Sequence, residues 1–203
     1  MAASPGLFGE DVPPGFQYRE DFISLADEQS LLEAIAHVEF SEFEMRGVVA
    51  RRRVAFFGHS YDGSDARPFP DFLLPVRARV AEWAARDPDA FAMALINEYR
   101  PGAPIGWHRD APQYDIVAGI SLGSGCRLKF RPYRFRKSSE PAAARRSATH
   151  EITLARRSAY LMTGPSRTAY EHHIPPVEAL RYSVTFRTLR SGEQRVRAFG
   201  DAR

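Results

Sequence analysis

Two stretches in the first half of the chain repeat apolar residues at the spacing of an amphipathic helix. Residues 24–40 begin with a capping-box-like pair, Ser24 and Asp27, and carry a stripe of Leu31, Leu32, Ile35 and Val38. Residues 71–86 repeat the pattern with Phe72, Val76, Val80 and Trp83. The pattern predicts two helices, each with one face turned towards a core.

The second half of the chain changes to short apolar or alternating runs separated by proline and glycine. We expect strands at residues 92–99, 105–108, 116–122, 127–131, 151–154, 158–163, 169–174 and 181–189. Many short strands at regular spacing are typical of a β-sandwich or barrel. The sequence therefore predicts an α+β, mainly β protein, with N-terminal helices packed outside an antiparallel jelly-roll core.

The 203 residues are expected to form one domain with three further segments. Residues 1–20 are rich in glycine and proline and predict an irregular arm. Residues 48–57 are β-rich but contain three consecutive arginines, and residues 58–70 read as a polar loop. Residues 137–149 predict a mobile loop inserted in the jelly-roll core, which spans about 91–190.

Charge and cysteine content narrow the classes of function. Lysine and arginine number 28 against 25 acidic residues, which gives a net charge of +3 and a pI near 9.2. This mild surplus permits a nucleic-acid partner without requiring one. The single cysteine, Cys126, cannot form an intramolecular disulfide. No signal peptide or membrane-spanning run is recognisable, so we expect a cytoplasmic protein, and we expect it to be a monomer.

Two segments carry the residue types of a metal site. His108 and Asp110 are two residues apart, so their side chains would project from the same face of a strand. A histidine from the pair His172 and His173 would complete a set of two imidazoles and one carboxylate. This set leaves positions open on an Fe(II) ion and is typical of non-haem iron oxygenases. A zinc site of the hydrolase kind is a more distant alternative.

A polar face on the last predicted strand points to an anionic co-substrate. Period-2 alternation places on that face Arg181, Ser183, Thr185 and Arg187. Two arginines facing the inside of a small barrel are costly without an anion, and arginine is suited to gripping a carboxylate. Upstream, Asn97 and Tyr99 also share one face and would add an amide and a hydroxyl to the same cavity. Together these residues predict a site for a keto-acid.

Six motifs follow one another over about residues 40–190. They are Asn97-x-Tyr99-x-Pro101-Gly102, Ile105-Gly106-Trp107-His108-x-Asp110, Ile120-Ser121-Leu122-Gly123, Gly164-x-x-Arg167, Tyr170-x-His172-x-Ile174 and Arg181-x-Ser183-x-Thr185-Phe186-Arg187. In this order they resemble the AlkB family of Fe(II)- and 2-oxoglutarate-dependent dioxygenases. The resemblance implies a double-stranded β-helix core. It also implies an enzyme that uses O₂ to hydroxylate the N-alkyl carbon of an alkylated base in DNA or RNA, releasing an aldehyde.

The resemblance also implies a role for each motif residue. The iron ligands would be His108, Asp110 and His172, with His172 preferred over His173 because it lies two residues before an isoleucine. Arg181, helped by Tyr99, would pair with the distal carboxylate of 2-oxoglutarate. Its keto-acid end would be held by Asn97 and Arg187. Ser183 stands where some relatives carry asparagine and would contact the same molecule.

About residues 41–69 occupy the position of the family's nucleotide-recognition lid. We expect Arg51, Arg52 and Arg53 to contact phosphates. Phe56, Phe57 or Tyr61 would stack on a base that is single-stranded or flipped out of a duplex, and Trp107 is a further candidate for binding the substrate. The alternative is that the phenylalanines belong to the core and the arginines are solvated.

Two other functions stay open from the sequence. One is an oxygenase of the same chemistry that acts on a protein side chain or a small molecule. The other is a catalytically silent nucleic-acid-binding module on the same fold. The complete set of three candidate ligands and two arginines argues against the silent module, because binding alone requires none of the five.

Overall fold

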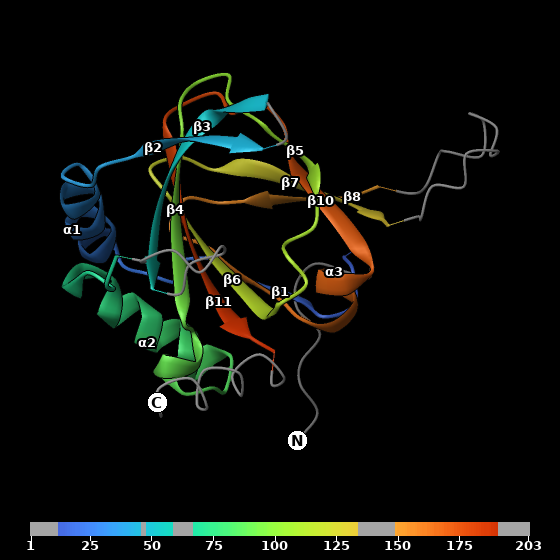
Figure 1. Cartoon of the computed structure of the whole chain (residues 1–203), viewed down its shortest axis with the longest axis horizontal. Helices are drawn as coiled ribbons and strands as arrows, with labels where there is room; N and C mark the ends of the chain where they lie inside the picture. The colour runs from blue at the N-terminus through green and yellow to red at the C-terminus, as the bar shows by residue number, and fades with distance from the viewer. Residues whose placement is uncertain (1–11, 46–47, 59–66, 134–148, 191–203) are drawn as a thin grey trace, which may run out of the picture.

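Two antiparallel sheets form the body of the protein (Figure 1). The computed structural model describes residues 12–45, 48–58, 67–133 and 149–190. Tyr61 and nearly all of the predicted loop at 137–149 lie outside these residues. Within them, the major sheet has the strand order β1 (Phe16–Arg19), β9 (Ala159–Met162), β6 (Tyr114–Leu122), β11 (Arg181–Leu189), β4 (Met93–Tyr99), β3 (Val48–Gly58) and β2 (Ser41–Met45). The minor sheet has the order β5 (Ile105–His108), β10 (Tyr170–Ile174), β7 (Cys126–Pro132) and β8 (His150–Leu154).

Two helices cover the outer face of the major sheet, on the left of Figure 1. Helix α1 (Leu25–Ile35) begins at Ser24, whose hydroxyl accepts from the backbone of Asp27 while the Asp27 carboxylate accepts from the backbone of Ser24. Helix α2 (Leu74–Trp83) follows a short 3₁₀ turn, η1 (Asp71–Leu73). Both helices end earlier than the sequence pattern predicts. After α2 the backbone takes a positive φ of 51° at Ala85, which a helix cannot continue through.

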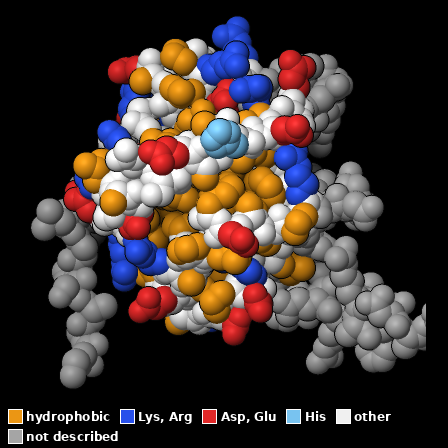
Figure 2. Space-filling view, turned by 90° about the vertical axis from the view of Figure 1, so that its left-hand side faces the viewer, with side chains coloured by type: hydrophobic (Ala, Val, Ile, Leu, Met, Phe, Trp, Pro, Cys, Tyr) orange, Lys and Arg blue, Asp and Glu red, His pale blue; other side chains and the backbone are white. Residues whose placement is uncertain are grey.

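The main apolar core lies between these helices and the major sheet. Alternation sends Val184 and Phe186 of β11 and Ile96 of β4 towards the helices, where Ile35 and Val80 meet them. Figure 2 views the molecule from the side on which the two helices lie, and there apolar side chains gather between charged ones. Leu25 and Leu74, which begin the two helices, are exposed. No helix in the described ranges is long and apolar enough to cross a membrane.

Two short elements differ from the expected pattern. The expected irregular arm contains β1, which pairs with β9 and brings Phe16 against the rings of Phe130 and Tyr160. Gly15 permits this pairing, since it has a φ of +88° and a Cβ there would meet the carbonyl oxygen of Thr163 at 2.1 Å. Helix α3 (Gly164–Thr168) was not predicted, because five residues carry too little periodicity. The jelly-roll core itself is as the strand pattern predicts.

Candidate functional site

The inner face of the major sheet is polar because of the register between β11 and β4. Arg181 pairs with Tyr99, and Ser183 pairs with Asn97. Since paired residues in antiparallel strands project from the same face, these four side chains line the space between the two sheets. All four are buried. The alternation seen in the sequence thus separates a polar inner face from an apolar face against the helices.

The minor sheet brings the three candidate metal ligands to the opposite wall of this space. His172 of β10 is the register partner of His108 of β5, and the centroids of their rings lie 4.2 Å apart. Asp110 follows two residues after His108, and its Oδ2 atom lies 3.6 Å from Nε2 of His172. As they stand, no three His, Cys, Asp or Glu side chains in the described ranges are arranged closely enough to hold a metal ion. The 3.6 Å between Oδ2 of Asp110 and Nε2 of His172 compares with the roughly 3 Å that separates neighbouring ligand atoms of one ion.

Asp110 is shared between an arginine and the two histidines. Arg187 donates from Nε and Nη2 to the Oδ1 atom of Asp110, at 3.0 and 2.8 Å. The other oxygen, Oδ2, is buried and has no hydrogen-bond partner among the described residues. Burial alone would raise the pKa of Asp110, but the charge of Arg187, with that of His172 and His108 when they are protonated at low pH, outweighs burial and holds this pKa well below its usual range. The carboxylate is therefore ionised, with one oxygen aimed at the histidines.

The two histidines are held as neutral imidazoles. Burial, and then the neighbouring His108, lower the pKa of His172 to about 3, and burial lowers the pKa of His108 as well. The Nδ1 atom of His108 donates to the carbonyl oxygen of Gly106 at 2.8 Å, which leaves its Nε2 lone pair for a metal. His173 points away, since its Nδ1 donates to the carbonyl oxygen of Ile105 at 2.6 Å. Of the two sequence candidates, only His172 faces Asp110.

Arg181 is a buried cation whose guanidinium contacts the neutral side chains of Ser121 and Tyr99. Its side chain is fully buried, its Nε donates to the hydroxyl of Ser121 at 3.1 Å, and its guanidinium lies over the ring of Tyr99. Its Nη1 atom has no hydrogen-bond partner in the part of the chain that the structure describes. A buried guanidinium with an unsatisfied N–H is expensive unless a ligand supplies an acceptor. This corner therefore fits a carboxylate.

Asn97 and Arg187, which were expected to hold the keto-acid end of 2-oxoglutarate, bind other side chains in this structure. Asn97 accepts a hydrogen bond at its Oδ1 atom from Nε of Arg52, 3.1 Å away. Arg187 is engaged with Asp110, and its Nη1 donates to the hydroxyl of Thr185 at 2.9 Å. Both side chains nevertheless lie on the inner face, between the Arg181 corner and the candidate ligands. Arg187 thus connects the predicted co-substrate site to the metal ligands.

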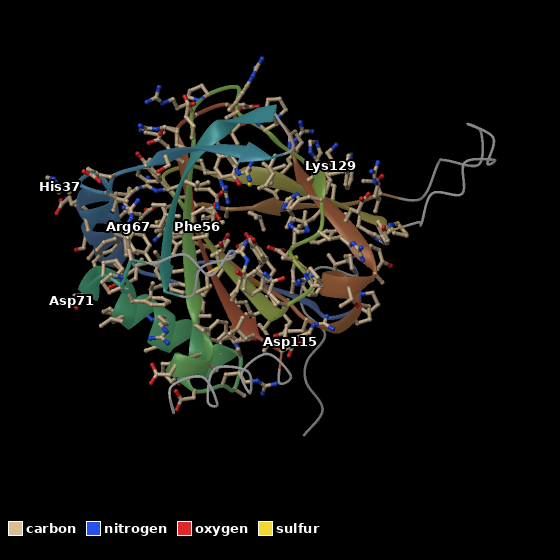
Figure 3. The ribbon with its side chains drawn as sticks, viewed as in Figure 1. His37, Phe56, Arg67, Asp71, Asp115 and Lys129 are labelled. Carbon is tan, nitrogen blue, oxygen red and sulfur yellow. The ribbon has the colours of Figure 1, made fainter. Side chains whose placement is uncertain are left out.

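The expected substrate residues separate onto different faces. Alternation along β3 places Arg52 on the inner face, while Arg51 and Arg53 project to the other side, where Arg53 binds Glu98 at 2.8 Å. Phe57 is buried against the helices, so it cannot stack on a base inside the barrel. Phe56, labelled in Figure 3, takes the inner position and packs against the cluster of Val54, Met93, Leu95 and Tyr114. Tyr61 lies outside the described residues.

Trp107 faces away from the candidate metal site. It neighbours His108 on β5, so strand alternation puts its ring on the outer face of the minor sheet. There it meets the ring of His173, with centroids 5.1 Å apart. Trp107 therefore does not face the candidate metal ligands, and its expected contact with the substrate stays a prediction. The same alternation that groups His108 with Asp110 excludes Trp107 from the group.

Three residues of the site had no role assigned from the sequence. Ser121 supports Arg181, and its place in the motif Ile120-Ser121-Leu122-Gly123 was the available signal. Arg167 of α3 is buried and donates to the backbone carbonyls of Ala111 and Tyr114, which fixes the segment that follows Asp110. Gly119 leaves room for the ring of Tyr160, which a Cβ at that position would meet at 2.3 Å.

Known sequences resemble this chain over most of its length. Residues 34–192 match the model of the 2OG-Fe(II) oxygenase superfamily. The "Probable RNA/DNA demethylase ALKBH6" of Danio rerio is 28% identical over 171 residues, which cover 81% of this chain and 71% of that protein. The "tRNA (carboxymethyluridine(34)-5-O)-methyltransferase ALKBH8" of Mus musculus is 29% identical over 199 residues. The match covers 91% of this chain but only 27% of the mouse protein, so the chain spans about a quarter of that relative.

Solved structures share the fold. "The structure of OsALKBH1" has a TM-score of 0.62 at 14% identity and covers 88% of this chain and 99% of that one. A Pseudomonas putida prolyl-4-hydroxylase has a TM-score of 0.59 at 12% identity, with 87% and 94% covered. The named relatives bear out the resemblance to AlkB proteins. With 159 of 203 residues inside the family model, the chain belongs to the 2OG-Fe(II) oxygenase superfamily.

Proposed function

We propose that this chain is an Fe(II)- and 2-oxoglutarate-dependent dioxygenase that oxidatively dealkylates alkylated bases in DNA or RNA. One observation carries the proposal. Among the described residues, four buried side-chain atoms have no hydrogen-bond partner, and two of them, Oδ2 of Asp110 and Nη1 of Arg181, belong to oppositely charged groups of the predicted metal and co-substrate sites. A cation beside the first and an anion beside the second would satisfy both, which is what Fe(II) and a dicarboxylate provide.

The candidate metal site fits iron by its donor set. His108, Asp110 and His172 would hold the ion, since two neutral imidazoles and an ionised carboxylate leave coordination positions open. With Fe(II) bound there, the chemistry supplied would be activation of O₂, the oxidant: one oxygen atom would go to the succinate formed as 2-oxoglutarate loses CO₂, and the other to the N-alkyl carbon, which then leaves the base as an aldehyde. Arg187 keeps Asp110 ionised and oriented, so that Oδ2 remains available to the metal.

The co-substrate would lie along the inner face from Arg181 to Arg187. Arg181 would grip the distal carboxylate, with Ser121 and Tyr99 fixing the direction of its guanidinium. Burial raises the pKa of Tyr99, so its hydroxyl stays protonated and can donate to the same carboxylate. Asn97, Ser183 and Arg187 would contact the keto-acid end. The low exposure of these side chains excludes water from the reacting groups.

The proposed nucleic-acid substrate rests on the relatives and on Arg52, which alone among Arg51, Arg52 and Arg53 faces inwards. ALKBH6 of zebrafish carries the name of a probable RNA/DNA demethylase, and ALKBH2 of Homo sapiens, 31% identical over 141 residues, that of a DNA oxidative demethylase. Arg52 lies on the inner face beside Asn97 and would contact the substrate there. We propose a single-stranded or flipped-out base as substrate, because an N-alkyl carbon in a stacked duplex cannot reach a buried metal. We also propose a monomer acting in the cytoplasm, where Fe(II) stays reduced.

Reconstitution tests the proposal directly. The protein is loaded anaerobically with Fe(II) and 2-oxoglutarate, then given O₂ and a single-stranded oligonucleotide that carries 1-methyladenine or 3-methylcytosine. Mass spectrometry should show loss of the methyl mass only when iron and 2-oxoglutarate are both present. The matched control is Asp110→Asn, which keeps the shape of the side chain and removes its charge.

Each other outcome points to a different function. Succinate formation without demethylation would reject nucleic acid and favour a protein side chain or a small molecule as substrate. Oligonucleotide binding without any succinate would favour the silent binding module. Demethylation that persists in Asp110→Asn would refute the proposed ligand set.

A further inference from the structure

The outer face of the minor sheet carries two arginines stacked on aromatic rings. The guanidinium carbon of Arg109 lies 3.5 Å from the centroid of the Tyr133 ring, and that of Arg131 lies 4.3 Å from a ring of Trp107. We name these four residues, Trp107, Arg109, Arg131 and Tyr133, the arginine–aromatic face. They come from β5, β7 and the residues directly after those strands. None of the four takes part in the candidate site inside the barrel.

This face adjoins the rim of the candidate site. Trp107 and Arg109 flank His108 in the sequence and project from the other side of the same segment. Nη1 of Arg109 donates to the carbonyl oxygen of Thr168 at 3.1 Å, close to the start of β10, which carries His172. The backbone of Tyr133 donates to Ala169 at 2.8 Å in the same region. A chain lying across the face therefore passes the end of the barrel where the candidate ligands lie.

Positive charge exceeds negative charge on this side of the minor sheet. Arg131 binds Glu171 at 2.7 Å, and Lys129, labelled in Figure 3, binds Glu151 at 2.8 Å. Arg109 is exposed and has no carboxylate partner among the described residues. Arg127 shares Glu151 with Lys129 at 3.6 Å and is 58% exposed. Four cations thus stand against two carboxylates, and Tyr133 leaves 37% of its surface open to solvent.

We propose that the arginine–aromatic face binds a single strand of nucleic acid next to the modified base. This inference rests on the proposed function and extends it by assigning the surface that holds the strand. Arginine matches phosphate geometry, and aromatic faces stack on any base, so the combination binds single strands without reading their sequence. An acidic peptide would use the cations but would leave the exposed ring of Tyr133 without a stacking partner. This ring therefore favours nucleic acid.

Binding without turnover tests the face. The full chain, loaded with Fe(II) and 2-oxoglutarate under anaerobic conditions, is titrated into a fluorescein-labelled single-stranded oligonucleotide, and anisotropy is recorded at several salt concentrations. Arg109→Gln should weaken binding by roughly 3- to 10-fold and reduce the slope of log affinity against log salt by about one. Tyr133→Leu should weaken binding by roughly 5- to 100-fold with the slope unchanged, because it removes stacking and no charge.

A distant arginine supplies the control. Arg86 is exposed after α2, on the side of the major sheet away from the minor sheet, and Arg86→Gln should change neither affinity nor slope. Thermal unfolding of each variant establishes that the fold is intact. Parental affinity and slope in both Arg109→Gln and Tyr133→Leu would overturn the proposal. Equal competition by poly-glutamate, lost in the same variants, would overturn nucleic acid as the ligand.

The outcome for the face is separable from the outcome for the proposed function. The anisotropy titration needs no O₂, so it reports on the face even if the protein fails to demethylate. Demethylation by the parent together with unaltered binding by the variants would keep the function and reject the face. Variant-sensitive binding by a protein that makes no succinate would keep the face and reject the function.

Discussion

Arg187 grips one oxygen of Asp110 with two nitrogens and leaves the other oxygen turned towards His172. The two contacts measure 3.0 and 2.8 Å, and the Oδ2 atom lies 3.6 Å from Nε2 of His172. The sequence motifs that carry these residues lie 77 positions apart. The arrangement fixes the carboxylate before any metal arrives, so its geometry does not depend on the ion. Four predictions concern the candidate site and the fold that positions it.

Arg187→Lys should weaken metal binding although it keeps the charge. A lysine ammonium is a single point charge and cannot reproduce a grip by two nitrogens, so the carboxylate would lose its fixed orientation. We expect a loss of roughly 10- to 100-fold in affinity for Fe(II) or Mn(II), measured by anaerobic calorimetric titration. Arg190→Lys, an exposed change just beyond β11, is the matched control. Parental affinity in Arg187→Lys would show that Asp110 is oriented by other contacts.

The two neighbouring histidines should behave differently when replaced by alanine. His172→Ala should abolish iron-dependent turnover of 2-oxoglutarate, because His172 faces Asp110 from the inner side of β10. His173→Ala should retain most of the turnover, since that ring lies on the outer face and binds the carbonyl of Ile105. Succinate formation by each variant makes the comparison. A larger defect in His173→Ala would reverse the proposed choice of ligand.

Arg181→Gln should raise the Michaelis constant for 2-oxoglutarate with little effect on the rate at saturation. Removing one partner of a buried charged pair costs at least about 2 kcal/mol of binding free energy. This cost corresponds to a rise of roughly 30-fold in the Michaelis constant. Initial rates of succinate formation over a range of 2-oxoglutarate concentrations give both constants. Arg100→Gln serves as control, because Arg100 follows Tyr99 but is exposed and binds Glu98. An unchanged Michaelis constant in Arg181→Gln would break the assignment.

Glu28 should matter for stability rather than for chemistry. It is fully buried on α1, accepts from the backbone of Gly123 at 2.8 Å and binds Nε of Arg156 at 2.6 Å. Glu28→Ala leaves both donors without their acceptor and should lower the free energy of unfolding by about 3 kcal/mol. Glu28→Gln should cost less, since the amide oxygen still accepts from Gly123. Urea unfolding measures both, and equal losses would mean that packing, not hydrogen bonding, sets the cost.

Alternation along strands made much of the site predictable from the sequence. In residues 181–187, one face must meet a polar cavity and the other must meet helices, so the pattern of Arg181, Val184 and Phe186 reports both surroundings. The same rule, applied to the triplet around His108, would have placed Trp107 outside the barrel. It also separates Phe56 from Phe57. In each case the period of two determines which face the side chain takes.

Partners across the sheet were not predictable from the chain alone. Alternation gives the face of Arg187 but not the distance to its neighbours, so its pairing with Asp110 needed the fold. The contact between Arg52 and Asn97 depends on the register of β3 against β4, which no local pattern specifies. Helix α3 and strand β1 are too short for periodicity to detect. Their positions follow from tertiary contacts, such as the docking of Gly15 against Thr163.

Strand β5 is only four residues long and forms one edge of the minor sheet, paired with β10 alone among the described strands. In β10, His172 is the register partner of His108. A metal ion bound by both histidines would therefore link the two strands. Without the ion, that pairing depends on a few backbone hydrogen bonds, and amide protons of residues 105–108 would exchange faster. A bared strand edge is also where β proteins recruit one another into aggregates. Loss of the proposed ion would therefore loosen the contact between β5 and β10 as well as remove the chemistry.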